Sequence, residues 1–65
     1  MNIVVNGQSR STEAGTVLEL LSEYGLERKM VVVEIEGAIV PKEQWAQTAL
    51  KDGLRIELVH FVGGG

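Results

Sequence analysis

The hydrophobic residues of this chain recur with a period of two, then at helical spacing, and then with a period of two again. Alternation near the start is typical of a strand, and Asn6-Gly7 is typical of a two-residue hairpin turn with positive φ. A strand, a hairpin, a single helix and more strands within 65 residues leave few folds. Predicted strands cover residues 1–5, 8–12, 31–36, 38–40 and 54–59.

The helical segment has a start signal and a stop signal. Thr16, followed three residues later by Glu19, predicts a capping box, in which each side chain accepts the backbone N–H of the other residue. Gly25 is suited to the left-handed conformation that ends a helix. The apolar stripe of this helix consists of Val17, Leu20, Leu21 and Tyr24.

This order of elements predicts an α+β fold. The connections are long enough for the first and last strands to be parallel neighbours in the middle of the sheet, since the helix supplies the crossover. We therefore predict a β-grasp (ubiquitin-like) fold, with a mixed sheet of four to five strands covered on one face by one main helix. The predicted domain spans residues 1–62, and residues 63–65 are predicted to form a flexible glycine tail.

The predicted core is small, as expected for so short a chain. Pro41 is expected to open a helical turn over residues 42–45. Trp45 is expected to cover one end of the core, with its indole N–H bonded to a carbonyl or to water. The inward positions are Ile3, Val5, Val17, Leu20, Leu21, Val31, Val33, Ile35, Ile56 and Leu58.

Composition argues against several classes of function. Nine acidic and six basic residues give a net charge of −3, which disfavours nucleic acid as a partner. With no cysteine and one histidine, we expect neither a metal site nor a catalytic relay, and hence no enzyme activity. No secretion signal or membrane span is readable, so a cytoplasmic location is expected. Any catalytic groups should belong to another chain.

The sequence ends in HFVGGG, and three successive glycines resist packing on a folded surface. A frayed end is the simple interpretation, whereas a slim arm of Gly63 and Gly64 could thread a narrow active site. The carboxylate of Gly65 is ionised at neutral pH and is a poor electrophile. It would need activation, for example by adenylation, before a sulfur or nitrogen nucleophile could attack it.

Two apolar residues near the end of the last strand share the outward parity of Arg55 and Glu57. Together with Val4 on the neighbouring strand, Val59 and Phe61 are predicted to form an exposed docking patch beside the tail. A bulge near His60 would reverse that parity. We expect His60 itself to be structural or solvated.

Several segments together resemble the ThiS family of thiamine-biosynthesis sulfur carriers, a branch of the ubiquitin-like sulfur carriers. The resemblance rests on MNIVVNG, IVPKEQW and LKDGLRIELVHFVGGG, and it covers essentially the whole chain. Glu36-Gly37 departs from the Asn-Gly often found at that turn in the family, and Lys42 stands where arginine is common.

The resemblance implies a carrier without activity of its own and with no bound cofactor. A ubiquitin-activating-like adenylyltransferase would use ATP and magnesium to adenylate Gly65. A sulfur donor, either a cysteine desulfurase or a rhodanese-like protein, would then supply the sulfur of a Gly65 thiocarboxylate. Thiazole synthase would accept that sulfur while it assembles the thiazole of thiamine.

Other functions remain open from the sequence. The small subunit of molybdopterin synthase has a similar tail, although its chains tend to be longer before the last strand. A ubiquitin-like protein modifier would instead link Gly65 to a lysine amine. A plain interaction module would make no use of the tail.

Overall fold

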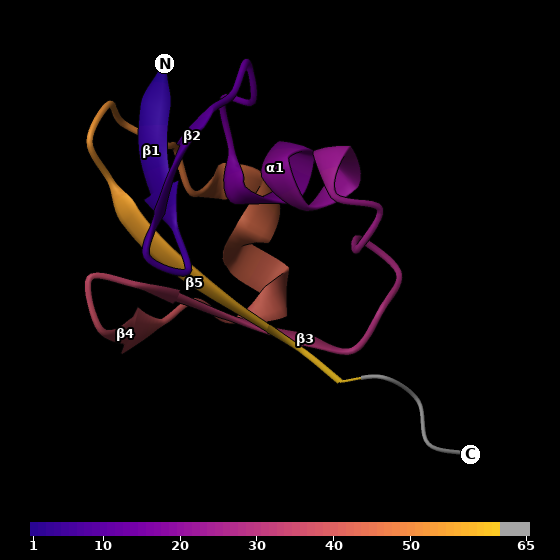
Figure 1. Ribbon diagram of the computed structural model, residues 1–65. Coiled ribbons are helices and arrows are strands. Elements are labelled where there is room, and N and C mark those ends of the chain that lie inside the picture. Colours follow the sequence, from indigo (N-terminus) through magenta and orange to yellow (C-terminus); the bar gives the residue numbers. More distant parts are fainter. Residues whose placement is uncertain (62–65) are drawn as a thin grey trace.

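The structure is a computed structural model that describes residues 1–61, and it contains one five-stranded mixed sheet with its helices on one face (Figure 1). The strand order is β2-β1-β5-β3-β4. Strand β5 runs parallel to β1 and antiparallel to β3, so the first and last strands are central neighbours. The predicted β-grasp fold is confirmed. The elements are β1 (Asn2–Val5), β2 (Gln8–Ser11), α1 (Val17–Glu23), β3 (Val31–Ile35), β4 (Ala38–Ile39), η1 (Lys42–Gln47, a 3₁₀ helix) and β5 (Arg55–His60).

Both hairpins turn through two residues with positive φ. Asn6 and Gly7 have φ of 50° and 81°, and Glu36 and Gly37 have φ of 50° and 87°. Two successive positive φ values match the twist of antiparallel strands, which explains glycine at the second position of each turn. The Glu36 carboxylate also accepts the backbone N–H of Arg55 at 3.1 Å. Glutamate in place of asparagine therefore preserves the backbone of this turn.

Helix α1 begins and ends where the sequence predicts, but its capping box forms only in part. The backbone N–H of Glu19 donates to Thr16 Oγ1 at 3.2 Å, as predicted. The Glu19 carboxylate accepts the N–H of Gly15 at 2.6 Å, so the predicted return bond to Thr16 is wrong by one residue. At the other end, Gly25 has φ of 70°, and Leu26 donates its N–H to Leu21 at 2.8 Å. Every helix leaves backbone N–H groups at its start and carbonyls at its end without intrahelical partners, and these bonds satisfy some of them.

The core lies between the sheet and the face formed by α1 and η1. Eight of the ten predicted core residues are buried, while Val31 and Ile35 are half-buried at the two ends of β3. Helix α1 has seven residues and spans about 10 Å, which is too short to cover both ends of that strand. Three further residues complete the buried cluster: Trp45, which was expected to cover one end of the core, and Ala14 and Leu50, which were not predicted.

Trp45 closes the core from η1, and this prediction is confirmed. Its side chain is 4% exposed, and its indole N–H donates to the carbonyl of Val40 at 3.0 Å. Helix η1 continues beyond the predicted turn to Gln47. Pro41 is the extended residue before it, with ψ of 149°, and does not occupy the first helical position. Among residues 1–61, neither helix has the length and apolar character needed to cross a membrane.

Candidate functional site

Strand β5 leads directly toward the glycines and is held on both sides. On the β1 side, the carbonyl of Leu54, just before β5, accepts the N–H of Val4 at 2.8 Å, and the carbonyl of Ile56 accepts the N–H of Asn6 at 3.0 Å. On the other side, the ladder with β3 continues past the strand end, where Phe61 donates its N–H to Met30 at 3.0 Å. The predicted reactive end at Gly65 and its arm, Gly63 and Gly64, lie outside the described residues. The boundary between domain and tail stays a prediction.

Asn6 has a second role that the sequence interpretation missed. Its side-chain oxygen accepts the N–H of Leu58 at 2.8 Å, and its side-chain amide donates to the Leu58 carbonyl at 3.2 Å. This carboxamide takes the place of a further β1 residue beside β5, because the main chain of β1 has already turned away. The sequence carries no signal for this contact, because turn formation alone accounts for Asn-Gly and Leu58 lies 52 residues further along the chain.

The structure brings two of the three predicted docking residues together and leaves the third apart. Val59 is 43% exposed and Phe61 is 53% exposed, on the face of the sheet opposite the helices. Val4 lies on the same face but pairs with Arg55, four positions before Val59 along β5. That separation is about 13 Å along the strand. The predicted patch is therefore not continuous.

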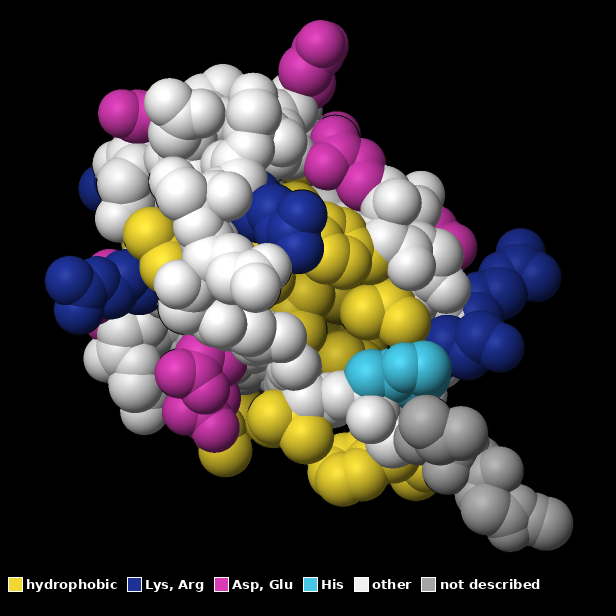
Figure 2. Space-filling view, in the orientation of Figure 1, with side chains coloured by type: hydrophobic (Ala, Val, Ile, Leu, Met, Phe, Trp, Pro, Cys, Tyr) yellow, Lys and Arg dark blue, Asp and Glu magenta, His cyan; other side chains and the backbone are white. Residues whose placement is uncertain are grey.

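The neighbours of Val59 and Phe61 come from β3 instead of β1. Val32 pairs with Val59, and Met30, which is 77% exposed, bonds to Phe61 through its backbone. The end of the sheet at Val59 is thus apolar. Figure 2 shows hydrophobic side chains at the surface on both sides of the single histidine. We call Val32, Val59 and Phe61, with Met30, the apolar end of the open face.

Charged residues occupy the middle of the same face. Glu34 and Glu57 are directly paired across β3 and β5, and Arg55 lies beside them in a shallow depression that also includes Glu36. Like charges side by side on an exposed sheet are destabilising unless solvent or a cation screens them. This charged area separates Val4 from the apolar end.

His60 is exposed at the last position of β5, where it pairs with Val31. Within residues 1–61, no group of three or more acidic or histidine side chains is placed to hold a metal ion. What the described part offers is a fixed strand end with an apolar surface beside it.

Comparison with known proteins assigns the chain to a family. A sequence profile described as the ThiS family matches residues 3–65. The chain belongs to the ThiS family. The resemblance noted from the sequence is thereby confirmed, and the match extends over the glycine end.

Relatives of the chain include free carriers and a longer enzyme. The chain is 47% identical over 53 residues to the sulfur carrier protein ThiS of Bacillus subtilis, covering 82% of this chain and 80% of that protein. It is 44% identical over 66 residues to a thiazole synthase of Paramagnetospirillum magneticum, covering all of this chain but 20% of the synthase. The chain thus spans about a fifth of the length of that relative.

A solved structure supports the fold assignment. The crystal structure of the thiamine biosynthesis protein ThiS from Geobacter metallireducens is 35% identical to this chain, with a TM-score of 0.82 and complete coverage of both chains. A sheet and helix arrangement shared at this level confirms the ThiS-type β-grasp.

Proposed function

We propose that this chain is a sulfur carrier for the thiazole moiety of thiamine, with the carboxylate of Gly65 as the group that is modified. The observation that carries this proposal is the ThiS family match over residues 3–65, which includes the three terminal glycines of the sequence. The B. subtilis relative is named a sulfur carrier protein. The chain contains no cysteine, so the sulfur would have to be held by something other than a side-chain thiol.

In this proposal, the partner enzymes supply the chemistry. A ubiquitin-activating-like adenylyltransferase binds ATP and magnesium, and a Gly65 carboxylate oxygen attacks the α-phosphorus of ATP. Pyrophosphate leaves, and the product is a glycyl adenylate. A sulfur atom from the donor then attacks the glycyl carbonyl, and AMP leaves. The donor, a cysteine desulfurase or a rhodanese-like protein, presents this sulfur as a persulfide, so the first product is an acyl disulfide between donor and carrier. A thiol reductant then attacks the donor sulfur; the donor leaves as a mixed disulfide with that thiol, and the carrier retains a thiocarboxylate.

Thiazole synthase is the proposed acceptor of that sulfur. Support comes from the P. magneticum relative, which is named thiazole synthase and contains a region similar to this whole chain. Residues Gly63 and Gly64 act as the slim arm that reaches the active site. Val59 and Phe61 dock against both enzymes, because they are exposed, apolar and adjacent to that arm. Val4 belongs to this docking surface only if a partner also spans the charged middle of the face.

The decisive experiment follows the mass of the carrier. The full chain is incubated with ATP, magnesium, the purified adenylyltransferase and a sulfur source, and intact mass spectrometry should show exchange of one oxygen for sulfur at Gly65. A chain lacking Gly64 and Gly65 is the matched control, and it should keep its fold and gain no sulfur. An unchanged mass in the complete reaction contradicts the proposal. So does a native protein that continues past Gly65 without trimming.

Cell-based complementation separates this function from the alternatives. A strain that lacks the carrier should require thiamine when it receives the truncated chain and should grow without thiamine when it receives the full chain. Growth with the truncated chain would favour a plain interaction module. Capture of targets joined to Gly65 by isopeptide bonds would favour a protein modifier. A cytoplasmic location stays a prediction throughout.

A further inference from the structure

Strand β3 has one edge that is only partly covered. The bonds of Phe61 to Met30 and of Glu36 to Arg55 direct the peptide groups of Met30 and Glu36 toward β5. Because backbone polar groups alternate along a strand, those of Val31 and Val33 point to the opposite edge. The N–H and C=O of Val31 have no backbone partner on that edge among residues 1–61. This edge of β3 is therefore open at its first residue.

The open edge arises because β4 leaves the sheet early. Strand β4 has two residues, and one further bond joins the N–H of Val40 to the carbonyl of Val33 at 2.8 Å. Pro41 follows and η1 begins at Lys42, so the chain turns away before it can pair with Val31. The carbonyl of Val40 is taken by the indole of Trp45.

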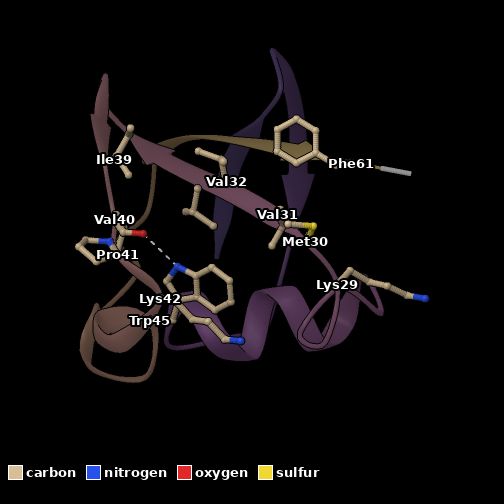
Figure 3. Close-up of a pocket in the computed structure, with 11 residues that line it drawn as sticks. Lys29, Met30, Val31, Val32, Ile39, Val40, Pro41, Lys42, Trp45 and Phe61 are labelled. Atoms are coloured by element: carbon tan, nitrogen blue, oxygen red, sulfur yellow. Dashed lines mark hydrogen bonds between the residues drawn. The ribbon is translucent and has the colours of Figure 1, made fainter. Parts of the chain in front are cut away.

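A groove of about 350 Å³ lies along this open edge (Figure 3). Trp45 forms its inner wall, and Ile39 and Phe61 stand at its two ends on the open face of the sheet. Ile39 is 67% exposed, so its side chain is available to a ligand. A bare strand edge next to exposed apolar side chains is the arrangement that accepts an added β-strand.

The charge of the groove is opposite to that of the chain. Lys29 and Lys42 both line it, and none of its lining residues is acidic, whereas the chain as a whole carries a net charge of −3. Both lysines extend from the side of the groove nearest the helices (Figure 3). A ligand that fits this groove should bring carboxylates to the two amino groups and apolar atoms to the indole wall.

We propose that the open edge of β3 binds an extended segment of a partner protein, with apolar side chains flanked by carboxylates. The segment adds a strand beside Val31, packs against Trp45 and Ile39, and pairs its acidic residues with Lys29 and Lys42. A second copy fits less well, because pairing β3 with β3 would bring the lysines of both copies together. The groove shares Met30, Val32 and Phe61 with the apolar end of the open face, but its open edge at Val31 and its two lysines lie outside that surface, and its test requires no sulfur-transfer enzyme.

The test uses the full chain labelled with ¹⁵N and two blocked synthetic pentapeptides, EVIVE and KVIVK. EVIVE should shift the amide signals of Val31 and Val33 and the indole signal of Trp45, and it should slow hydrogen exchange at the Val31 amide. KVIVK should bind at least about threefold more weakly, since its charges repel the groove.

Variants then locate the charge preference. Lys42→Glu should weaken EVIVE and strengthen KVIVK, whereas Lys51→Glu, an exposed lysine outside the groove, should leave both affinities unchanged. The proposal is overturned if the shifts cluster on β2 or around Val59, or if the two lysine variants behave alike. It is also overturned if the same signals move with protein concentration alone, which would identify a second copy as the occupant.

Discussion

The two faces of β5 differ strongly in the exposure of their side chains. Ile56 and Leu58 point toward the helices and are 1% and 8% exposed, whereas Val59, the next residue, is 43% exposed on the open face. The same strand therefore contributes to the core with one set of side chains and offers a surface with the other. The contrast predicts that stability depends mainly on the covered face and the proposed docking on the open face, so substitutions on the two faces should have separate effects.

The largest effect is expected from truncation on the covered face. Ile56→Ala should lower the free energy of unfolding by about 2–5 kcal/mol, since it removes buried methyl groups and leaves a cavity. Val59→Ala on the same strand should cost less than about 1 kcal/mol, because much of that side chain is already in water. Urea denaturation of both variants gives the comparison. Equal losses would mean that the two faces do not differ in their contribution to stability.

An intermediate effect is expected at Asn6, which joins the two central strands. Asn6→Ala should cost about 1–3 kcal/mol, because it leaves the N–H and C=O of Leu58 without their partner and places alanine at positive φ. Asn6→Gly removes the same hydrogen bonds but tolerates the positive φ, so it should be the milder change. Hydrogen exchange at the Leu58 amide should accelerate in both variants. Unchanged exchange at Leu58 would show that the Asn6 side chain does not protect this strand.

The smallest effect on stability is expected at the apolar end of the open face. Phe61→Asp should change the free energy of unfolding by less than about 0.5 kcal/mol, as for most exposed positions. Its affinity for thiazole synthase and for the adenylyltransferase should fall by about tenfold or more, if Phe61 is a central contact. Isothermal titration calorimetry measures the affinity of the variant for each of the two enzymes.

Leu18→Asp is the matched control for Phe61→Asp. Leu18 is 37% exposed on α1, away from the open face of the sheet. This variant should bind both enzymes as the unchanged chain does. The same loss of affinity in both variants, or in neither, would contradict docking through Phe61.

Local sequence patterns predicted the elements and much of the core. The helical stripe from Val17 to Leu21, the turn at Asn6-Gly7 and the alternation through Ile56 and Leu58 each depend on residues within one element. Such patterns record which face of an element avoids water, and burial of that face is the main favourable term in folding. The burial of Trp45 was expected from its residue type and not from periodicity, and it is confirmed.

Relations between elements could not be predicted in this way. The parallel register of β1 and β5 places Val4 beside Arg55 and away from Val59, although all three have the expected parity. The Glu19 carboxylate caps Gly15 instead of Thr16, one residue from the predicted position. Register depends on residues that are far apart in the sequence, whereas the partner that a local side chain such as Glu19 reaches depends on its rotamer.

By itself, the sequence determined the strand and helix order, the inward residues of β5 and the family resemblance, because each is recorded in local spacing or in short segments. The tertiary structure alone decided that Asn6 holds Leu58, that Val4 stands apart from the apolar end, and that Lys29 and Lys42 flank one groove at the open edge of β3. The reason is physical. Periodicity is set by neighbours along the chain, whereas register and grooves are set by how the elements pack against one another.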